Sequence, residues 1–292
     1  MTSPSALAVL CPNIFRLTEQ FLPFFGIVKS KMQNALRSRD LLRVSEKDGQ
    51  ELVSDLDTDI ECAAKQFLAD LSRRFLGTDI PFVGEESWTG SLPPAKDFWI
   101  VDPIDGTHNF LAGLPQYGTM VALIKNQEVV FSIIYLPWER GGEDGIYFAG
   151  RGLGAWRWAP VSERLAVSEE PSSASILFLE GASRKILASR FLQRTKAHVR
   201  RAREGAASCY SFTRVASGAN LRIGTVGATV GNKPYDNLPG CLLIEEAGGI
   251  VRDFYDNQWS IENCSNLVFG NENAVHDIIA EGQASCIRLL GE

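Results

Sequence analysis

Five short apolar runs, separated by turns, dominate what the first half of the chain can fold into. They lie at residues 80–83, 98–101, 119–124, 129–135 and 145–149. Runs of this length, rich in β-branched and aromatic residues and bounded by turn residues, are typical of strands. Short links join most of them, and short links favour antiparallel neighbours. This half of the chain therefore predicts a mainly antiparallel sheet.

Two helical patterns precede these strands. Apolar residues recur at helical spacing over residues 12–39 and again over residues 58–75. The second pattern opens with Thr58-x-x-Glu61, which fits a capping box, and Gly77 follows it as a common helix stop. The sequence thus predicts a long helix and then a capped helix, with its first turn at Thr58.

After Val161 strand-like and helical runs alternate. A strand is predicted at residues 176–179, and helices are predicted at 183–193, 206–217, 236–247 and 274–280. This alternation is typical of α/β folds. We therefore predict an α/β protein with an α+β N-terminal subdomain at residues 1–160 and an α/β C-terminal subdomain at residues 161–292. The boundary is expected within residues 160–171, with a cleft shared by the two parts.

Composition and charge argue against several classes of protein. The chain has 292 residues and a formal net charge of −6, which disfavours a general binder of nucleic acid or membrane surfaces. It contains no run of ~18 apolar residues, so no membrane span is expected. The six cysteines form no C-x-x-C pair and no zinc-ligand cluster. Reduced thiols in a cytoplasmic protein are the expectation.

Acidic residues stand at the ends of predicted strands and at the starts of predicted helices. They are Asp57, Glu85, Glu86, Asp102, Asp105 and Asp236. Open α/β proteins assemble their sites at such places. Carboxylates without nearby histidine or cysteine ligands favour hard cations such as Mg²⁺, which would also relieve their mutual repulsion. Two or more Mg²⁺ ions about 4 Å apart would bind a phosphate and activate a water.

The turn after Asp105 adds groups that suit a phosphate. Gly106 allows close approach of the backbone, and the amides around Gly106 and Thr107 are suited to phosphate oxygens. The Thr107 hydroxyl is placed to orient an attacking water. These residues together indicate metal-assisted phosphoryl chemistry.

Each of these residues also has a purely structural interpretation. Asp57 and Asp236 are candidates for helix caps, Glu85 and Glu86 for solvated loop acids, and the Asp102/Asp105 pair for turn residues. His108 is a candidate general base or simply a neighbour of the site. Cys209 and Tyr210 are interpreted as packing or substrate-wall residues rather than nucleophiles. Gly150-x-Gly152-x-x-Ala155 matches a dinucleotide fingerprint but lacks the helix that should follow it.

Three motifs in order along the chain resemble those of the inositol monophosphatase family. They are GEES at 84–87, DPIDGT at 102–107 and DNLPGCLLIEEAGG at 236–249. Members of that family are Mg²⁺-dependent, lithium-sensitive phosphatases. The resemblance implies alternating layers of helix and sheet, an α/β/α/β/α sandwich as in fructose-1,6-bisphosphatase, and assembly as a homodimer.

The resemblance also implies a role for each matching residue. Glu85, Asp102, the Ile104 carbonyl, Asp105 and Asp236 resemble the ligands of two or three Mg²⁺ ions. Glu85 and Thr107 resemble the pair that positions the nucleophilic water, with Asp57 supporting Thr107. Substrate contacts are implied at Asp105, Gly106, Thr107, Ala206, Ala207, Ser208 and Asp236. Lys47, Glu86 and His108 are expected next to the site.

The residues that bear on substrate choice resemble two different branches of the family. Thr229 stands where inositol-specific members carry an acid, and residues 218–236 are longer than usual. KPYD at 233–236 resembles the histidinol-phosphate phosphatase branch, whereas THNF at 107–110 is closer to the inositol branch. The predicted function is hydrolysis of a small polyol phosphate, with inositol monophosphate first and histidinol phosphate as the alternative. A 3′(2′),5′-bisphosphate nucleotidase and a catalytically silent phosphate-metabolite binder remain further alternatives. The expected partner is a small phosphorylated metabolite, not nucleic acid or membrane.

Overall fold

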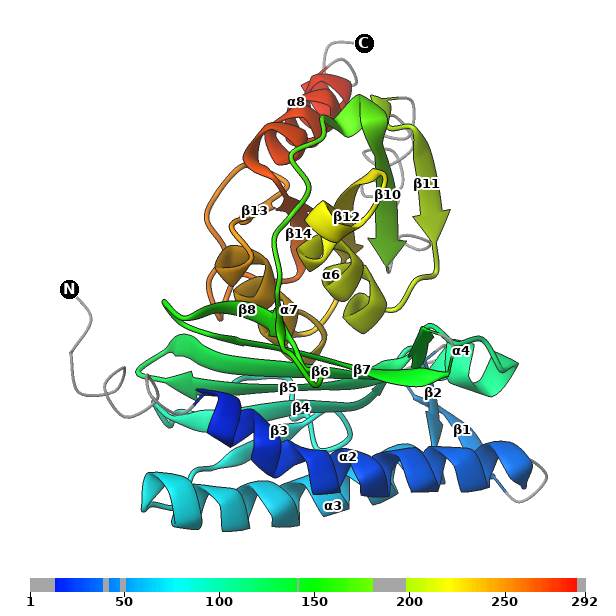
Figure 1. Cartoon of the computed structure of the whole chain (residues 1–292), viewed down its shortest axis with the longest axis vertical. Coiled ribbons are helices and arrows are strands. Elements are labelled where there is room, and N and C mark those ends of the chain that lie inside the picture. Colours follow the sequence, from blue (N-terminus) through cyan, green and yellow to red (C-terminus); the bar gives the residue numbers. More distant parts are fainter. Residues whose placement is uncertain (1–13, 39–41, 48–50, 141, 181–197, 288–292) are drawn as a thin grey trace.

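Two sheets stack with helices outside and between them, as Figure 1 shows. The computed structural model describes residues 14–38, 42–47, 51–140, 142–180 and 198–287. From one side to the other the layers are a helix pair, a seven-stranded sheet, a second helix pair, a five-stranded sheet and a final helix. This α/β/α/β/α order confirms the predicted fold class.

The seven-stranded sheet has the strand order β3-β4-β5-β6-β7-β8-β9. Its strands are β3 (Phe82–Gly84), β4 (Phe98–Asp105), β5 (Gly118–Lys125), β6 (Glu128–Arg140), β7 (Glu143–Gly150), β8 (Gly154–Arg157) and β9 (Glu163–Arg164). All neighbours pair antiparallel except β3 and β4, which are parallel. The predicted strands are confirmed, and β3 lies beside β4 through a long connection rather than a hairpin.

Helices α2 (Ile14–Arg37) and α3 (Asp55–Leu71) cover one face of this sheet (Figure 1). Their apolar positions interlock with the outward side chains of the strands, for example through the stacked rings of Phe25 and Tyr135, 4.6 Å apart. A short π-helical turn, η2 (Ser72–Leu76), follows α3 and ends at Gly77 with φ 67°, the predicted stop. The hairpin of β1 (Val44–Lys47) and β2 (Glu51–Ser54) joins the two helices.

The start of α3 differs from the prediction. The helix begins at Asp55, and its N-cap is Ser54 rather than a residue beside Thr58. Asp57 Oδ2 accepts hydrogen bonds from the Ser54 backbone N–H at 2.8 Å and from the Ser54 hydroxyl at 2.5 Å. The predicted capping role of Glu61 is therefore wrong, because Asp57 already occupies the capping position and Glu61 lies one turn further along.

The five-stranded sheet has the order β11-β10-β12-β14-β13, with mixed parallel and antiparallel pairing. The strands are β10 (Ser175–Glu180), β11 (Arg201–Glu204), β12 (Gly224–Val230), β13 (Ile250–Asp253) and β14 (Asn266–Gly270). Short 3₁₀ turns, η3 (Ser172–Ala174) and η4 (Gly218–Asn220), precede β10 and β12. The helix predicted at 183–193 lies outside the described residues.

Helices α6 (Ser208–Ala216) and α7 (Pro234–Glu246) lie between the two sheets, and α8 (Glu272–Ile287) covers the far side of the smaller sheet (Figure 1). The predicted helices at 206–217, 236–247 and 274–280 are confirmed with shifted ends. One apolar core joins α6 and α7 to both sheets. The subdomain division near residue 160 stays a prediction, because this shared core belongs to residues on both sides of it.

At Gly240, helix α7 packs tightly against Phe212 of α6. A Cβ at Gly240 would lie 2.1 Å from two ring atoms of Phe212, which is stacked at 4.0 Å on Phe269. Phe212 and Phe269 are fully buried, so the ring cannot move aside. Gly240→Ala is expected to lower the free energy of unfolding in urea by about 1–3 kcal/mol.

The control for Gly240→Ala is Gly26→Ala in α2. Gly26 is exposed, and a Cβ there would meet nothing within 4 Å. That variant is expected to gain up to about 1 kcal/mol from helix propensity. Equal stabilisation by both substitutions would contradict the packing argument.

None of the described helices combines the length and the apolar character needed to cross a membrane.

Candidate active site

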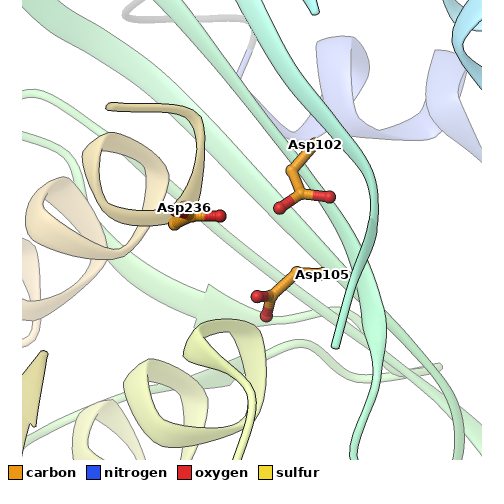
Figure 2. A group of neighbouring side chains, drawn as sticks. All are labelled: Asp102, Asp105 and Asp236. Atoms are coloured by element: carbon orange, nitrogen blue, oxygen red, sulfur yellow. The ribbon is translucent and has the colours of Figure 1, made fainter. Parts of the chain in front are cut away.

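Strand β4 carries two of the site's carboxylates. Its apolar residues are buried on both faces, and the strand holds this position up to Asp102 and Asp105 at its end. The pairing with β5 is interrupted between these two residues, so the backbone there leaves the regular ladder. The Thr119 hydroxyl donates to the Pro103 carbonyl at 2.8 Å and fixes this irregular segment. The break in register lets both aspartates face the same side, as Figure 2 shows.

Helix α7 brings the third carboxylate. Pro234 is its first residue, Lys233 its N-cap, and Asp236 accepts the Lys233 backbone N–H through Oδ2 at 2.7 Å. Asp236 is thus in the first turn of the helix rather than at the predicted N-cap. Oxygens of Asp102, Asp105 and Asp236 lie within 4.8 Å of one another, and the side chains point toward a common centre (Figure 2).

Burial and like charge make the Asp102 carboxylate costly when ionised. The pKa of Asp102 is raised well above its usual value by burial first, and then by the negative charges of Glu85, Asp105 and Asp236. Asp102 Oδ1 is buried and has no hydrogen-bond partner among the described residues. A divalent cation among these oxygens would supply both the missing partner and the missing positive charge. The donor set therefore fits a hard divalent metal such as Mg²⁺.

The first residues of α6 partly offset the cost of burying the negative charge of Asp105. Burial raises the pKa of Asp105, and this is opposed by hydrogen bonds from Cys209 and from the Ser208 backbone. The Cys209 backbone N–H donates to Asp105 Oδ2 at 2.5 Å. The amino end of a helix favours a negative charge, so α6 holds Asp105 in its orientation toward the other two carboxylates.

Gly106 brings the Asp105 turn against α6. Its φ of 85° is left-handed, which favours glycine, and a Cβ would lie 2.7 Å from Ala207 Cβ and 2.8 Å from the Gln116 carbonyl. Both the conformation and the space therefore require glycine. The predicted contact segment Ala206–Ser208 is thus brought next to the DPIDGT turn.

Thr107 and Asp57 meet as predicted. The buried Thr107 hydroxyl lies 3.2 Å from Asp57 Oδ1 and 2.9 Å from the Ile104 carbonyl. One hydroxyl has one proton, so it donates to only one of these acceptors at a time. Asp57 uses its other oxygen to cap α3, so it is both a helix cap and a partner of Thr107. Burial raises the pKa of Asp57, and hydrogen bonds from Ser54 and Thr107 oppose that rise.

The GEES loop follows β3, next to β4. The Glu85 backbone N–H donates to the Val101 carbonyl at 3.1 Å, directly before Asp102. The negative charge of Glu85 is among the causes that raise the pKa of Asp102, so the Glu85 carboxylate lies close enough to Asp102 to act on it. The Glu86 backbone N–H donates to Glu61 Oε2 at 2.7 Å. The GEES loop thus brings Glu85 near Asp102 and contacts α3 through the Glu86 backbone.

The other residues predicted to bind substrate or to lie beside the site are on four different elements. Ser208 is buried and its hydroxyl accepts a hydrogen bond from Asn232 Nδ2 at 2.7 Å. His108 is exposed on α4 (Thr107–Ala112), directly after Thr107. Lys47 is the last residue of β1, and its backbone pairs with Glu51. Thr229 is fully buried near the end of β12, and its hydroxyl has no partner among the described residues.

The Cys209 thiol and the glycine-rich turn at 150–155 have structural roles rather than roles as a nucleophile and a dinucleotide-binding loop. Burial raises the pKa of the Cys209 thiol well above its usual value, with Asp105 adding to the rise, so the thiol stays protonated and is no nucleophile. The GRGLGA turn links β7 and β8 without a helix, and the backbone N–H groups of Gly152 and Gly154 donate to the Glu246 carboxylate at 2.7 and 2.8 Å. A carboxylate of the chain itself fills this turn, so the dinucleotide interpretation is excluded there.

Sequence reasoning missed two residues of the site's surroundings, Glu61 and Asn232. Glu61 is buried on α3 and contacts the GEES loop, although the sequence assigned it to a capping box. Its spacing offered a signal, because Glu61 lies four residues after Asp57 and so shares a helix face with it. Asn232 carried no comparable signal.

Residues 24–288 match the sequence model of the inositol monophosphatase family. The chain belongs to the inositol monophosphatase family. Its members are metal-dependent phosphatases, and this chain is therefore an enzyme of that class. The cluster of Asp102, Asp105 and Asp236 stands where the family motifs predict metal ligands.

Individual relatives bear different names. The chain is 28% identical to a fructose-1,6-bisphosphatase/inositol-1-monophosphatase of Thermotoga maritima, over 81% of this chain and 86% of the relative. It is 32% identical to a putative Nus factor SuhB of Neisseria meningitidis serogroup B, over 85% and 90%. A solved IMPase/NADP phosphatase complexed with Mg²⁺ and phosphate has the same fold, with a TM-score of 0.71, 18% identity and coverage of 91% and 95%.

Proposed function

We propose that this member of the inositol monophosphatase family is a Mg²⁺-dependent phosphomonoesterase of small polyol phosphates, with inositol monophosphate as the first candidate substrate. The observation that carries the proposal is the convergence of the Asp102, Asp105 and Asp236 oxygens, one of which, Asp102 Oδ1, is buried without a hydrogen-bond partner among the residues that the structure describes. Carboxylate oxygens at this spacing suit a small hard cation and a phosphate oxygen together.

Glu85, Asp102, the Ile104 carbonyl, Asp105 and Asp236 would hold two or three Mg²⁺ ions. When bound, the metal supplies positive charge that stabilises the phosphate oxygens and the departing alkoxide and makes water more acidic. The structural relative complexed with Mg²⁺ and phosphate supports this choice of ion.

The protein's own residues prepare the nucleophile. Glu85 and Thr107 would orient a water for in-line attack on phosphorus. When Thr107 donates its proton to Asp57 Oδ1, its oxygen keeps lone pairs free to accept a hydrogen bond from that water. The Gly106–Thr107 turn and the Ala206–Ser208 segment would contact the phosphate ester.

Substrate choice depends on the alcohol side of the site. Thr229 stands where inositol-specific members carry an acid, so this position offers no carboxylate to sugar hydroxyls, and the Thr229 hydroxyl is buried. In KPYD at 233–236, Lys233 is the N-cap and the other three residues open the first turn of α7, where Tyr235 packs edge-on against Trp88 with ring centroids 5.7 Å apart. The resemblance of KPYD to the histidinol-phosphate phosphatase branch supports histidinol phosphate as the alternative substrate.

The test is phosphate release across a panel of esters. The panel holds inositol-1-phosphate, histidinol phosphate, fructose-1,6-bisphosphate, glycerol-2-phosphate and adenosine 3′,5′-bisphosphate. We expect Mg²⁺-dependent release from inositol-1-phosphate first, and inhibition by EDTA and Li⁺. Faster release from histidinol phosphate would identify the protein as a histidinol-phosphate phosphatase. Faster release from adenosine 3′,5′-bisphosphate would identify it as a nucleotidase. Release that survives EDTA would overturn the metal assignment, and binding without release would indicate a silent binder.

The assembly is carried over from the resemblance, and the location from the widely spread cysteines. We propose a cytoplasmic homodimer whose partner molecule is a small phosphorylated metabolite. One relative bears the name of a Nus factor, so the expected absence of a nucleic-acid partner stays a prediction. Sedimentation at micromolar concentration tests the dimer.

A further inference from the structure

Glu61 is a buried acid for which the proposed reaction has no use. It lies on α3 with 7% of its surface exposed. A buried carboxylate is costly unless polar groups surround it. The Glu86 backbone N–H donates to its Oε2 at 2.7 Å. The GEES loop therefore supplies a hydrogen bond that stabilises Glu61, and Glu61 in turn holds the loop.

Gly84 shows how closely Glu61 fits. A Cβ at Gly84 would lie 2.2 Å from both Cδ and Oε2 of Glu61 and 2.6 Å from Oε1. Gly84 belongs to strand β3 and its φ is not left-handed. Glycine is needed at this position for space, because the Glu61 carboxylate occupies the volume that a side chain would take.

These two contacts lie on either side of Glu85. The Glu61 carboxylate lies against Gly84, the residue before Glu85, and accepts the backbone N–H of Glu86, the residue after it. The Glu85 backbone N–H donates to the Val101 carbonyl at 3.1 Å. The backbone of Glu85 is thereby fixed between α3 and β4. One turn earlier on the same face of α3, Asp57 contacts Thr107 at 3.2 Å.

We infer that Glu61 is a positioning residue that sets Glu85 relative to Thr107. One turn of α3 contacts both loops, so the helix acts as a common support for the two side chains proposed to orient the water. The inference rests on the proposed function for the roles of Glu85 and Thr107, but the contact of Glu61 with the GEES loop does not. Misplacing a positioned group by about 1 Å costs on the order of 10²-fold in rate.

The experiment compares Glu61→Ala, Glu61→Gln and Asp59→Ala. We expect Glu61→Ala to lower kcat by about 10–100-fold with little change in KM, and to weaken Mg²⁺ binding in calorimetry by about tenfold. Glu61→Gln keeps an oxygen that accepts the Glu86 N–H, so kcat should stay within about threefold of wild type. Asp59 is an exposed acid on the same helix and serves as the control, with unchanged values.

A second measurement does not depend on turnover. Gly84→Ala should lower Tm by about 5 °C or more in the wild-type background and by less than half as much in Glu61→Ala, because the carboxylate that it meets is gone. The Glu86 amide should exchange with solvent about tenfold faster in Glu61→Ala than in wild type. If Glu61→Ala does not fold, Glu61→Gln takes its place in both measurements. Gly84→Ala is then expected to lower Tm in Glu61→Gln by as much as in wild type. The Glu86 amide is expected to exchange as slowly in Glu61→Gln as in wild type.

Each failure has its own signature. Wild-type protein that releases no phosphate with Mg²⁺ refutes the proposed function, while amide exchange and the Gly84 comparison still test the contact. A Glu61→Ala variant with wild-type kcat and Mg²⁺ affinity overturns the positioning inference alone. So does an unprotected Glu86 amide in the wild-type protein, or an equal cost of Gly84→Ala in wild type and Glu61→Ala.

Discussion

Asp102→Asn is expected to lower kcat by about 10³-fold on the best substrate of the panel. Asparagine has nearly the same shape but carries no negative charge, so the ion that Asp102, Asp105 and Asp236 would share loses a charged ligand. A metal contributes several kcal/mol of transition-state stabilisation, and about 4 kcal/mol corresponds to 10³-fold in rate. The measurement is steady-state phosphate release with saturating Mg²⁺.

The same substitution should stabilise the metal-free protein. Burial and three neighbouring carboxylates raise the pKa of Asp102, so removing its charge relieves repulsion. A gain of roughly 1 kcal/mol or more at pH 8 is expected, since one unit of pKa shift corresponds to about 1.4 kcal/mol. Asp97→Asn near the opposite end of the strand is the control, because asparagine can still accept the Asn126 N–H that Asp97 binds at 3.0 Å. Ordinary turnover in Asp102→Asn would refute the assignment.

The stability of metal-free protein should depend on pH in a direction fixed by the site. Burial raises the pKa values of Asp57, Asp102 and Asp105 in the folded state. Below the ordinary carboxyl pKa of about 4, all three are protonated in both states and their contribution is fully present. As the pH rises, the unfolded chain releases protons first, so this contribution is lost up to and through the raised folded pKa values.

Mg²⁺ should reverse this loss. At 100 times its dissociation constant a ligand adds about 2.7 kcal/mol to stability, and protons compete with metal for the carboxylates. We expect a larger Mg²⁺-induced rise in Tm at pH 8 than at pH 5, and little rise at either pH in Asp102→Asn. Glu139 and Asp253 have lowered pKa values and oppose the trend as background, so the wild-type-minus-variant difference is the quantity to compare. A larger Mg²⁺ effect at pH 5 would contradict the carboxylate site.

The carboxylates were predictable because their signal is local. Asp102 and Asp105 sit at the end of a strand, and Asp236 sits in the first turn of a helix. Their convergence followed from the motifs, and the structure brings the three together. The predicted roles of individual residues in binding metal and water stay predictions.

What the sequence did not reveal depends on contacts between distant segments. Two capping patterns compete at the start of α3, and the spacing alone cannot show that Ser54 and Asp57 form the cap while Glu61 is used by the GEES loop. Likewise, the parallel pairing of β3 with β4 depends on a long connection whose path local pattern does not fix.

Helix α7 gives the third carboxylate an unusual degree of restraint. Most of its residues are buried, between two sheets that share one core. The body of the helix, which carries the half-buried Asp236 in its first turn, therefore cannot shift without disturbing that core, so the backbone of the candidate metal site has no hinge on this side. We expect loss of the ion on heating to coincide with global unfolding in one cooperative step, rather than to precede it as a separate opening of the site.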